Sequence, residues 1–254
     1  MITKLTMQIT SPEGREINTN MSSLLHGYLM NNMDDAYAYK MHESALRPFS
    51  QYIARKGDGW QWTVSTLTDE AEEHIIKPLM GTSSLELNHN GMTLEVFEHE
   101  LVKTSFDKLF VSNYISGESS RIVQMRFVTP TSFKSNGKYL NYPMLKLIFS
   151  SLIKKYDSSS ETTSLYDDRL IEQLPECTEV IGYNLRSTLF HLEGVKIPSF
   201  VGSIKIKVRG SSNMVSLVNM LAEFARYSGV GIKCAIGMGG IGETDYEMRG
   251  KGNE

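Results

Sequence analysis

The sequence predicts an α+β protein with two tandem ferredoxin-like domains, residues 1–118 and 119–254, and a glycine-rich loop near the C-terminal end. Hydrophobic periodicity in the first half gives the order strand, helix, strand, strand, helix, strand, which is the split βαβ arrangement. The second half offers a similar series, although no repeat is visible in the amino acids themselves. A chain of 254 residues is long enough for two domains that each bury a core.

The first half begins with an alternating strand over residues 1–9, followed by a helix that Ser22 can cap. A second short helix is expected over residues 35–46, because Asp34 favours a helix start and Pro48 prevents continuation. The other elements expected in this half are a strand at 60–66, a helix at 69–80, and strands at 84–87 and 91–106 around a turn at 89–91.

The second half shows the same kinds of pattern with less clarity. The elements expected there are strands at 122–128 and 200–209 and helices at 143–156 and 214–227, with an acidic insert between the first helix and the second strand. The predicted duplication of the domain therefore depends on the order of the elements alone, and not on a repeat in the sequence.

Composition excludes several classes of protein. Hydrophobic residues make up 41% and charged residues 22%, as in ordinary globular domains. No run approaches the roughly 20 apolar residues that would span a bilayer. Cys177 and Cys234 are far apart and have no CxxC or CxxH neighbours, so the sequence predicts neither a disulfide framework nor a zinc site. We therefore expect a cytoplasmic protein without membrane contact, metal or cofactor.

Charge is segregated along the chain. The formal net charge is −3, but residues 121–155 carry seven Lys or Arg and no acid, whereas residues 61–120 carry three basic and ten acidic side chains. Such blocks are usually solvated faces. A protein charged in this way can still bind a polyanion on one side.

Six glycines lie close together near the end of the chain, and part of this run satisfies GxGxxG. A dinucleotide fingerprint needs a strand before it and a helix after it, and the residues that follow leave no room for that unit. This context argues against a nucleotide-dependent oxidoreductase. Two interpretations stay open: a tight turn that needs positive φ angles, or a backbone that approaches phosphate closely with Lys233 beside it. The glycines are Gly229, Gly231, Gly237, Gly239, Gly240 and Gly242.

The segment from Ser203 to Arg209 predicts a strand with one cationic face. Period-two alternation places Lys205, Lys207 and Arg209 together and the intervening apolar residues on the opposite face. Like charges on one strand face repel each other, so this arrangement favours phosphate binding over an empty surface, although exposed solubilising lysines remain the simpler alternative.

The N-terminal helices carry side chains suited to RNA cleavage without a metal. That reaction needs a base for the 2′-OH, an acid for the 5′-oxygen and a cation for the phosphorane. The side chains of these types in the two helices and just after them are His26, Tyr28, Tyr37, Tyr39, Lys40, His42 and Arg47. In one straight helix His26 and His42 would stand about 24 Å apart, so they can act together only if the chain turns back near residues 31–35.

Several strings together resemble one family: LLHGYLM and KMHESALRPFS near the start, VTPTSFKSNGKYLNYP in the middle, and KIPSFVGSIKIKVRG and GVGIKCAIGMGGIGE near the end. They are similar to the CRISPR-associated repeat-cleaving endoribonucleases of the RAMP superfamily, and most of all to members linked to type III-A systems. The resemblance spans almost the whole chain in the expected order. It implies tandem ferredoxin-like domains and metal-independent cleavage within precursor repeat RNA, leaving 2′,3′-cyclic phosphate and 5′-hydroxyl ends.

The resemblance also assigns residues. The family's histidine falls on His42 and its cation on Arg47, while Met30 stands where some members carry a tyrosine. His26, one turn before Met30, and the nearby Tyr28 are then the candidate partners of His42. The basic strand, Lys233 and the glycines would hold RNA phosphates.

A non-catalytic RAMP subunit that binds guide RNA in an effector complex is the alternative function. Repeat RNA is the expected partner, and a homodimer and a transient contact with a type III effector complex are left open. Salt-sensitive RNA binding is expected in every case, whereas only a nuclease loses its product when His42 is replaced.

Overall fold

The computed structural model describes residues 1–87, 91–116, 119–161 and 163–243 of the chain. The expected turn at 89–91 lies partly outside these residues, and so does the expected domain boundary at 118. Among the described residues, no helix combines the length and apolar character needed to cross a bilayer.

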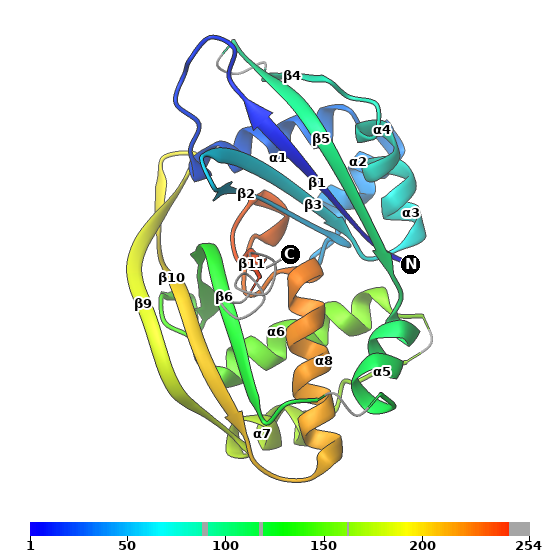
Figure 1. Ribbon diagram of the computed structural model, residues 1–254, viewed down its shortest axis with the longest axis vertical. Coiled ribbons are helices and arrows are strands. Elements are labelled where there is room, and N and C mark those ends of the chain that lie inside the picture. Colours follow the sequence, from blue (N-terminus) through cyan, green and yellow to red (C-terminus); the bar gives the residue numbers. More distant parts are fainter. Residues whose placement is uncertain (88–90, 117–118, 162, 244–254) are drawn as a thin grey trace.

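The first half of the chain forms a five-stranded antiparallel sheet in the order β2-β3-β1-β5-β4 (Figure 1). β3 lies between β1 and β2 and is antiparallel to both, so β1, the helices and β2 make a split βαβ unit. The strands are β1 (Ile2–Thr10), β2 (Phe49–Lys56), β3 (Gly59–Thr66), β4 (Ser84–Leu87) and β5 (Met92–Thr104). The helical segments are η1 (Thr19–Met21), α1 (Ser22–Asn31), α2 (Asp35–Glu43), α3 (Asp69–Ala71), the π-helical turn η2 (Glu72–Ile76) and α4 (Lys77–Leu79).

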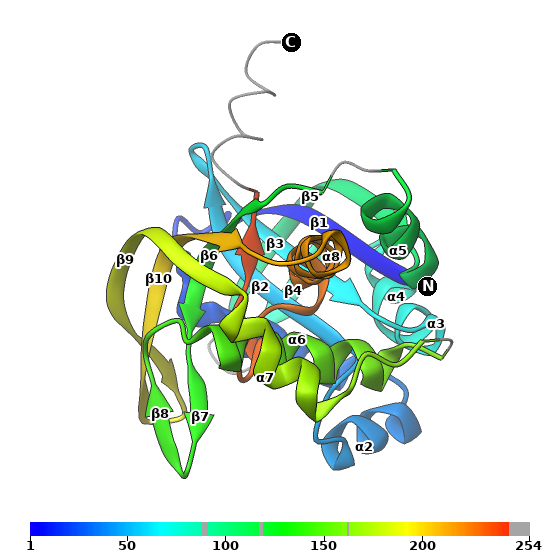
Figure 2. The ribbon, with the colours of Figure 1, turned by 90° about the horizontal axis from the view of Figure 1, so that it is seen from below.

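The second half forms a four-stranded sheet in the order β11-β6-β10-β9, with a small hairpin, β7–β8, that projects from the body of the molecule (Figure 2). Its strands are β6 (Ile122–Thr131), β7 (Phe133–Ser135), β8 (Lys138–Leu140), β9 (Thr178–Leu192), β10 (Val195–Val208) and β11 (Ile241–Gly242). Its helical segments are α6 (Leu145–Ser159), α7 (Asp168–Glu176), α8 (Ser212–Ser228) and η3 (Cys234–Ile236), and α5 (Phe106–Tyr114) precedes the sheet.

Both sheets have the ferredoxin-like strand order, which confirms the predicted fold class. In the first sheet the order β2-β3-β1-β5 is extended by β4, and in the second the corresponding order is β9-β10-β6-β11. The predicted elements at 1–9, 35–46, 60–66, 143–156 and 214–227 are present with shifted ends, and the strand at 84–87 has the predicted bounds. The acidic insert between the expected helix at 143–156 and the expected strand at 200–209, in which the sequence named no element, contains α7 and β9.

The start of α1 differs from the prediction. Ser22 is the first residue of α1, and its hydroxyl donates to the Thr19 carbonyl at 2.8 Å instead of capping the helix. The preceding turn η1 satisfies the local backbone, so α1 begins without a side-chain cap. Ser22 is fully buried and stands against β2, where its hydroxyl also accepts from Ile53 N.

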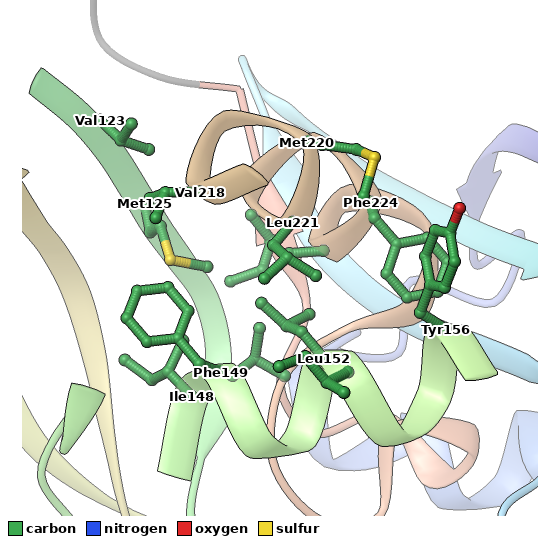
Figure 3. Packing of buried hydrophobic residues seen from close by; sticks show 14 of the residues in the cluster. Val123, Met125, Ile148, Phe149, Leu152, Tyr156, Val218, Met220, Leu221 and Phe224 are labelled. Atoms are coloured by element: carbon green, nitrogen blue, oxygen red, sulfur yellow. The ribbon is translucent and has the colours of Figure 1, made fainter. Parts of the chain in front are cut away.

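Two hydrophobic cores lie under the two sheets, and each takes residues from the other half. In the second core Phe149 and Leu152 of α6 pack with Leu221 and Phe224 of α8 beneath β6 (Figure 3). Ile2 and Leu67 of the first half belong to this same core, and Ala235 of η3 belongs to the first one. The two halves are therefore joined by packed side chains.

The end of α8 and the segment after it bind the first sheet directly. The Ser50 hydroxyl of β2 donates to the Tyr227 carbonyl at 2.5 Å. Beyond α8 the chain runs between β2 and β6, as Figure 1 shows for the red segment, and ends the second sheet as β11. The C-terminal segment is thus held on both sides.

Candidate active site

The chain reverses direction between α1 and α2. The Asn32 side chain donates to the Tyr28 carbonyl and ends α1, and Asp34 caps α2 by accepting from the Ala36 and Tyr37 N–H groups at 3.0 and 3.2 Å. Because of this turn, α1 and α2 are separate helices. The chain therefore turns back near residues 31–35, as the approach of His26 and His42 requires. His26 and His42 lie close enough for the charge of one to act on the other.

His26 and Arg47 are directly hydrogen-bonded. Arg47 Nη1 lies 3.1 Å from His26 Nε2, and Arg47 Nε donates to the Met41 carbonyl at 3.1 Å. A guanidinium can only donate, so His26 Nε2 must accept and the imidazole proton sits on Nδ1. These two contacts use two of the five N–H groups of the Arg47 guanidinium. The other N–H groups make no hydrogen bond among the described contacts.

The surroundings of His26 keep its ring neutral. Its pKa is lowered from 6.5 to about 4, mainly by burial and also by the positive charges of Arg47, His42 and Lys233, while the Ala235 carbonyl acts in the opposite direction. The ring stacks on Phe49 with centroids 6.1 Å apart. Nδ1 is buried without a hydrogen bond of good geometry. His26 is therefore an uncharged acceptor near neutrality.

His42 has a different environment. It lies in the last turn of α2 with its side chain exposed. A cation at the C-terminal end of a helix is favoured by the helix dipole. His42 is thus accessible to a large substrate in a way that His26 is not.

Tyr28 does not join this cluster. Tyr28 follows His26 by two positions, which is a rotation of about 200° around the helix axis. It therefore lies on a different side of α1 from His26. It lines a cavity of about 210 Å³ together with Asn32, His74 and Leu79. A catalytic role of Tyr28 stays a prediction, and its position does not support one.

The basic strand has the predicted alternation. Ile204, Ile206 and Val208 are buried to within 1%. Lys205 and Lys207 are exposed on the other face of β10, and Arg209, also exposed, follows directly after the strand ends at Val208. Arg209 forms an ion pair with Glu179 of β9, so two of the three cations have no ion-pair partner among the described contacts.

The glycines pack against the protein itself. Gly237 has φ +113°, and a Cβ placed there would lie 2.1 Å from Ser22 Cβ. Five of the six glycines donate their N–H within the chain: Gly229 to Ala225 O, Gly231 to Ser151 Oγ, Gly237 to Cys234 O, Gly239 to Pro130 O and Gly240 to Thr129 Oγ1. The tight-turn interpretation accounts for these contacts, and binding of RNA by the glycines stays a prediction.

Lys233 is the residue of this segment that adds a positive charge near the histidine cluster. It is exposed, it has a left-handed backbone with φ +56°, and its charge acts on His26. The glycine-rich segment therefore brings a cation from the second half to the helices of the first.

Gln51 is a residue of the site that the sequence does not reveal. Its Nε2 donates to the carbonyls of Ser22 and Ala235 at 2.8 and 3.3 Å, and its Oε1 accepts from Trp62 at 2.9 Å. It is 1% exposed, so it joins α1, the glycine-rich segment and β3 from inside. Two of its partners are distant along the chain, and a lone glutamine in an alternating strand gives no signal of them.

Comparison with known proteins decides the family. The model of the CRISPR-associated endoribonuclease Cas6 family matches residues 125–241. A Cas6 endoribonuclease of Streptococcus thermophilus is 32% identical over 85% of this chain and 88% of its own length. The chain belongs to the Cas6 family. A second member, from Mycobacterium tuberculosis, is 30% identical over 93% of this chain and 76% of its own length.

Solved Cas6 structures share the fold. A Cas6 product complex superposes with a TM-score of 0.78 at 20% identity and covers 96% of this chain and all of its own. Thermus thermophilus Cas6 gives a TM-score of 0.70 at 21% identity, covering 94% and 96% of the two chains. Among the described residues of this family member, no three His, Cys, Asp or Glu side chains gather in a way that could hold a metal ion.

Proposed function

We propose that this protein cleaves CRISPR repeat RNA in precursor transcripts without a metal ion. The 2′-OH attacks the adjacent phosphate, and the products are a 2′,3′-cyclic phosphate and a 5′-hydroxyl. Membership of the Cas6 endoribonuclease family supports the substrate and the cleavage. The observation that carries the mechanism is that Arg47 is hydrogen-bonded to His26, and that His42 at the end of α2 lies close enough for its charge to act on His26.

His42 is the proton-transfer group in this proposal. Its exposed imidazole can reach the RNA backbone, and histidine is the side chain that most often transfers protons in enzymes. A single imidazole can take the proton of the 2′-OH or give one to the 5′-oxygen. Either role requires it to lie within hydrogen-bond reach of the scissile phosphate.

Arg47 stabilises the phosphorane. Its guanidinium is fixed by His26 Nε2 and the Met41 carbonyl, so its free N–H groups are aimed before the RNA arrives. Charge that is oriented in advance contributes most to the transition state. His26, neutral and with Nε2 occupied, holds this arginine in place and is a positioning residue in our assignment.

The second half binds the RNA backbone. Lys205 and Lys207 on β10 and Lys233 beside the cluster are exposed cations suited to phosphate. The domain limits 1–118 and 119–254, a cytoplasmic location, a homodimer and contact with a type III effector complex stay predictions of the sequence.

Cleavage of labelled repeat RNA in excess EDTA tests the function. Wild type is expected to give cyclic-phosphate product, and His42→Ala to cleave roughly 10²- to 10⁴-fold more slowly with RNA binding retained. Binding without cleavage by wild type would favour the non-catalytic RNA-binding subunit. Cleavage unchanged in His42→Ala would remove His42 from the reaction, and cleavage abolished by EDTA would overturn the metal-free mechanism.

A further inference from the structure

Lys155 of α6 is a buried cation that the proposed reaction does not use. It belongs to the basic block at residues 121–155, yet it is only 9% exposed, between the core residues Leu152 and Tyr156. Burial of an ammonium group is costly unless hydrogen bonds replace its water. Lys155 therefore requires close acceptors.

Among the described residues, the acceptors of Lys155 lie at the end of α8 and in the segment that follows it. Its Nζ donates to the carbonyls of Ser228 and Gly229 at 3.2 and 3.0 Å and to Cys234 Sγ at 2.9 Å. The last carbonyls of a helix lack partners in the helix and carry partial negative charge, so a cation is favoured there. The contact with Cys234 extends this anchor across the loop to the start of η3.

The anchored segment carries the contacts that the second half makes with the proposed site. Lys233 and Ala235 flank Cys234 on either side. The charge of Lys233 and the carbonyl of Ala235 act on His26, and the same carbonyl accepts from Gln51. Displacement of Cys234 would therefore move both neighbours relative to the His26–Arg47 pair.

We propose that Lys155 is a positioning residue of the active site, which acts by clamping Ser228, Gly229 and Cys234 so that Lys233 and Ala235 stand against His26. The assignment rests on the proposed function, because it gives Lys155 an effect on RNA cleavage. The clamp itself has consequences that can be measured without RNA.

The test replaces Lys155 by methionine, which has a similar length without the charge. Lys154→Met is the matched control, since Lys154 is the neighbouring residue on the same helix and is exposed. Cys234→Ala, which removes only the Sγ contact, is studied in parallel and carries the test if Lys155→Met does not fold. Three quantities are compared in protein verified as folded: single-turnover cleavage, RNA affinity, and the His26 pKa from NMR of labelled histidine.

We expect Lys155→Met to slow cleavage of bound RNA by roughly 10- to 10²-fold, as small displacements at an active site do. The His26 pKa should rise from about 4 toward 6.5, because a loosened segment admits water and burial is the largest cause of the low value. Cys234→Ala should shift both quantities less, in the same direction, and Lys154→Met should shift neither.

A Lys155→Met protein with lower thermal stability but unchanged cleavage and an unchanged His26 pKa would show a purely structural role and overturn the proposal. The same holds for Cys234→Ala if only that variant folds. If wild type fails to cleave repeat RNA, the proposed function is lost, and the His26 pKa still decides whether Lys155 clamps the segment.

Discussion

The two halves of this molecule have the same strand order and different contents. In the first, the helices after β1 carry His26, His42 and, just beyond them, Arg47. In the second, the corresponding helix α6 turns apolar side chains and Lys155 inward, and the exposed cations lie on β10. In the proposed function, one half supplies groups for chemistry, and the other supplies charge for binding and a segment that reaches across.

This difference shows that the strand order does not decide what each half can do. A ferredoxin-like fold fixes where helices lie relative to the sheet, and the side chains placed on them fix the chemistry. The separation also has a practical value, because changes in the first half should alter cleavage and changes in the second should alter RNA affinity. The three predictions below test that division.

Arg47→Ala should give the largest effect among them. Loss of the fixed guanidinium should slow cleavage of bound RNA by about 10²- to 10³-fold, with affinity changed much less. Arg47→Lys should lie between this variant and wild type, because lysine keeps the charge but not the fork. Single-turnover rates at saturating protein give the comparison, and circular dichroism checks the fold. A variant that lost affinity with an unchanged rate would place Arg47 with the binding residues.

His26→Gln should change how stability depends on pH. In the folded protein the His26 pKa lies near 4, below the value near 6.5 of an unfolded chain, so the stabilising contribution is complete above pH 6.5 and is lost as pH falls toward 4. Between pH 7.5 and pH 5.0 this group alone should remove about 2 kcal/mol from the free energy of unfolding.

Glutamine can accept from Arg47 and does not titrate, so the variant should lose less stability over this interval by about that amount. Urea unfolding at the two pH values measures the difference. Equal losses in wild type and variant would mean that His26 titrates normally and is not a buried acceptor.

Lys205→Ser and Lys207→Ser should give the smallest effects. Each should lower the dependence of log affinity on log salt by about one and leave the cleavage rate of bound RNA unchanged. Lys77→Ser is the control, since Lys77 is an exposed lysine paired with Glu73 on the acidic side of the chain. A slower rate in Lys205→Ser at saturating protein would break the division between the halves.

Local signals in the sequence were sufficient for most of the fold. Alternation gave β1, β3 and β10, and the pair of Asp34 and Pro48 located α2, because these patterns depend on neighbours along the chain. β9 was missed because it is an edge strand with mostly exposed side chains, so its residues carry little hydrophobic pattern. The Ser22 cap was wrong because η1 occupies the position where a cap would act.

The residues of the candidate site also fall into two groups, those that the local sequence could indicate and those that depend on distant contacts. His26, His42 and Arg47 could be named from residue types near one turn, and the structure brings them together. Gln51 and Lys155 could not be named, because their partners are fixed only when the two halves pack. The glycines could be named, but a glycine pattern does not say whether the close neighbour is a phosphate or, as at Gly237, Ser22 of the same chain.

During synthesis, the segment after α8 is added later than the residues of α1 and β2 that it contacts. A growing chain that has reached only Tyr227 already contains the two histidines and the arginine, but it lacks the carbonyl of Ala235, the charge of Lys233 and the strand β11. A Cβ at Gly237 would clash with Ser22, so the segment packs closely on the start of α1. Residues 229–242 thus complete both the second sheet and the proposed site, and a product truncated at Tyr227 would carry the reactive side chains without Lys233, the Ala235 carbonyl and β11.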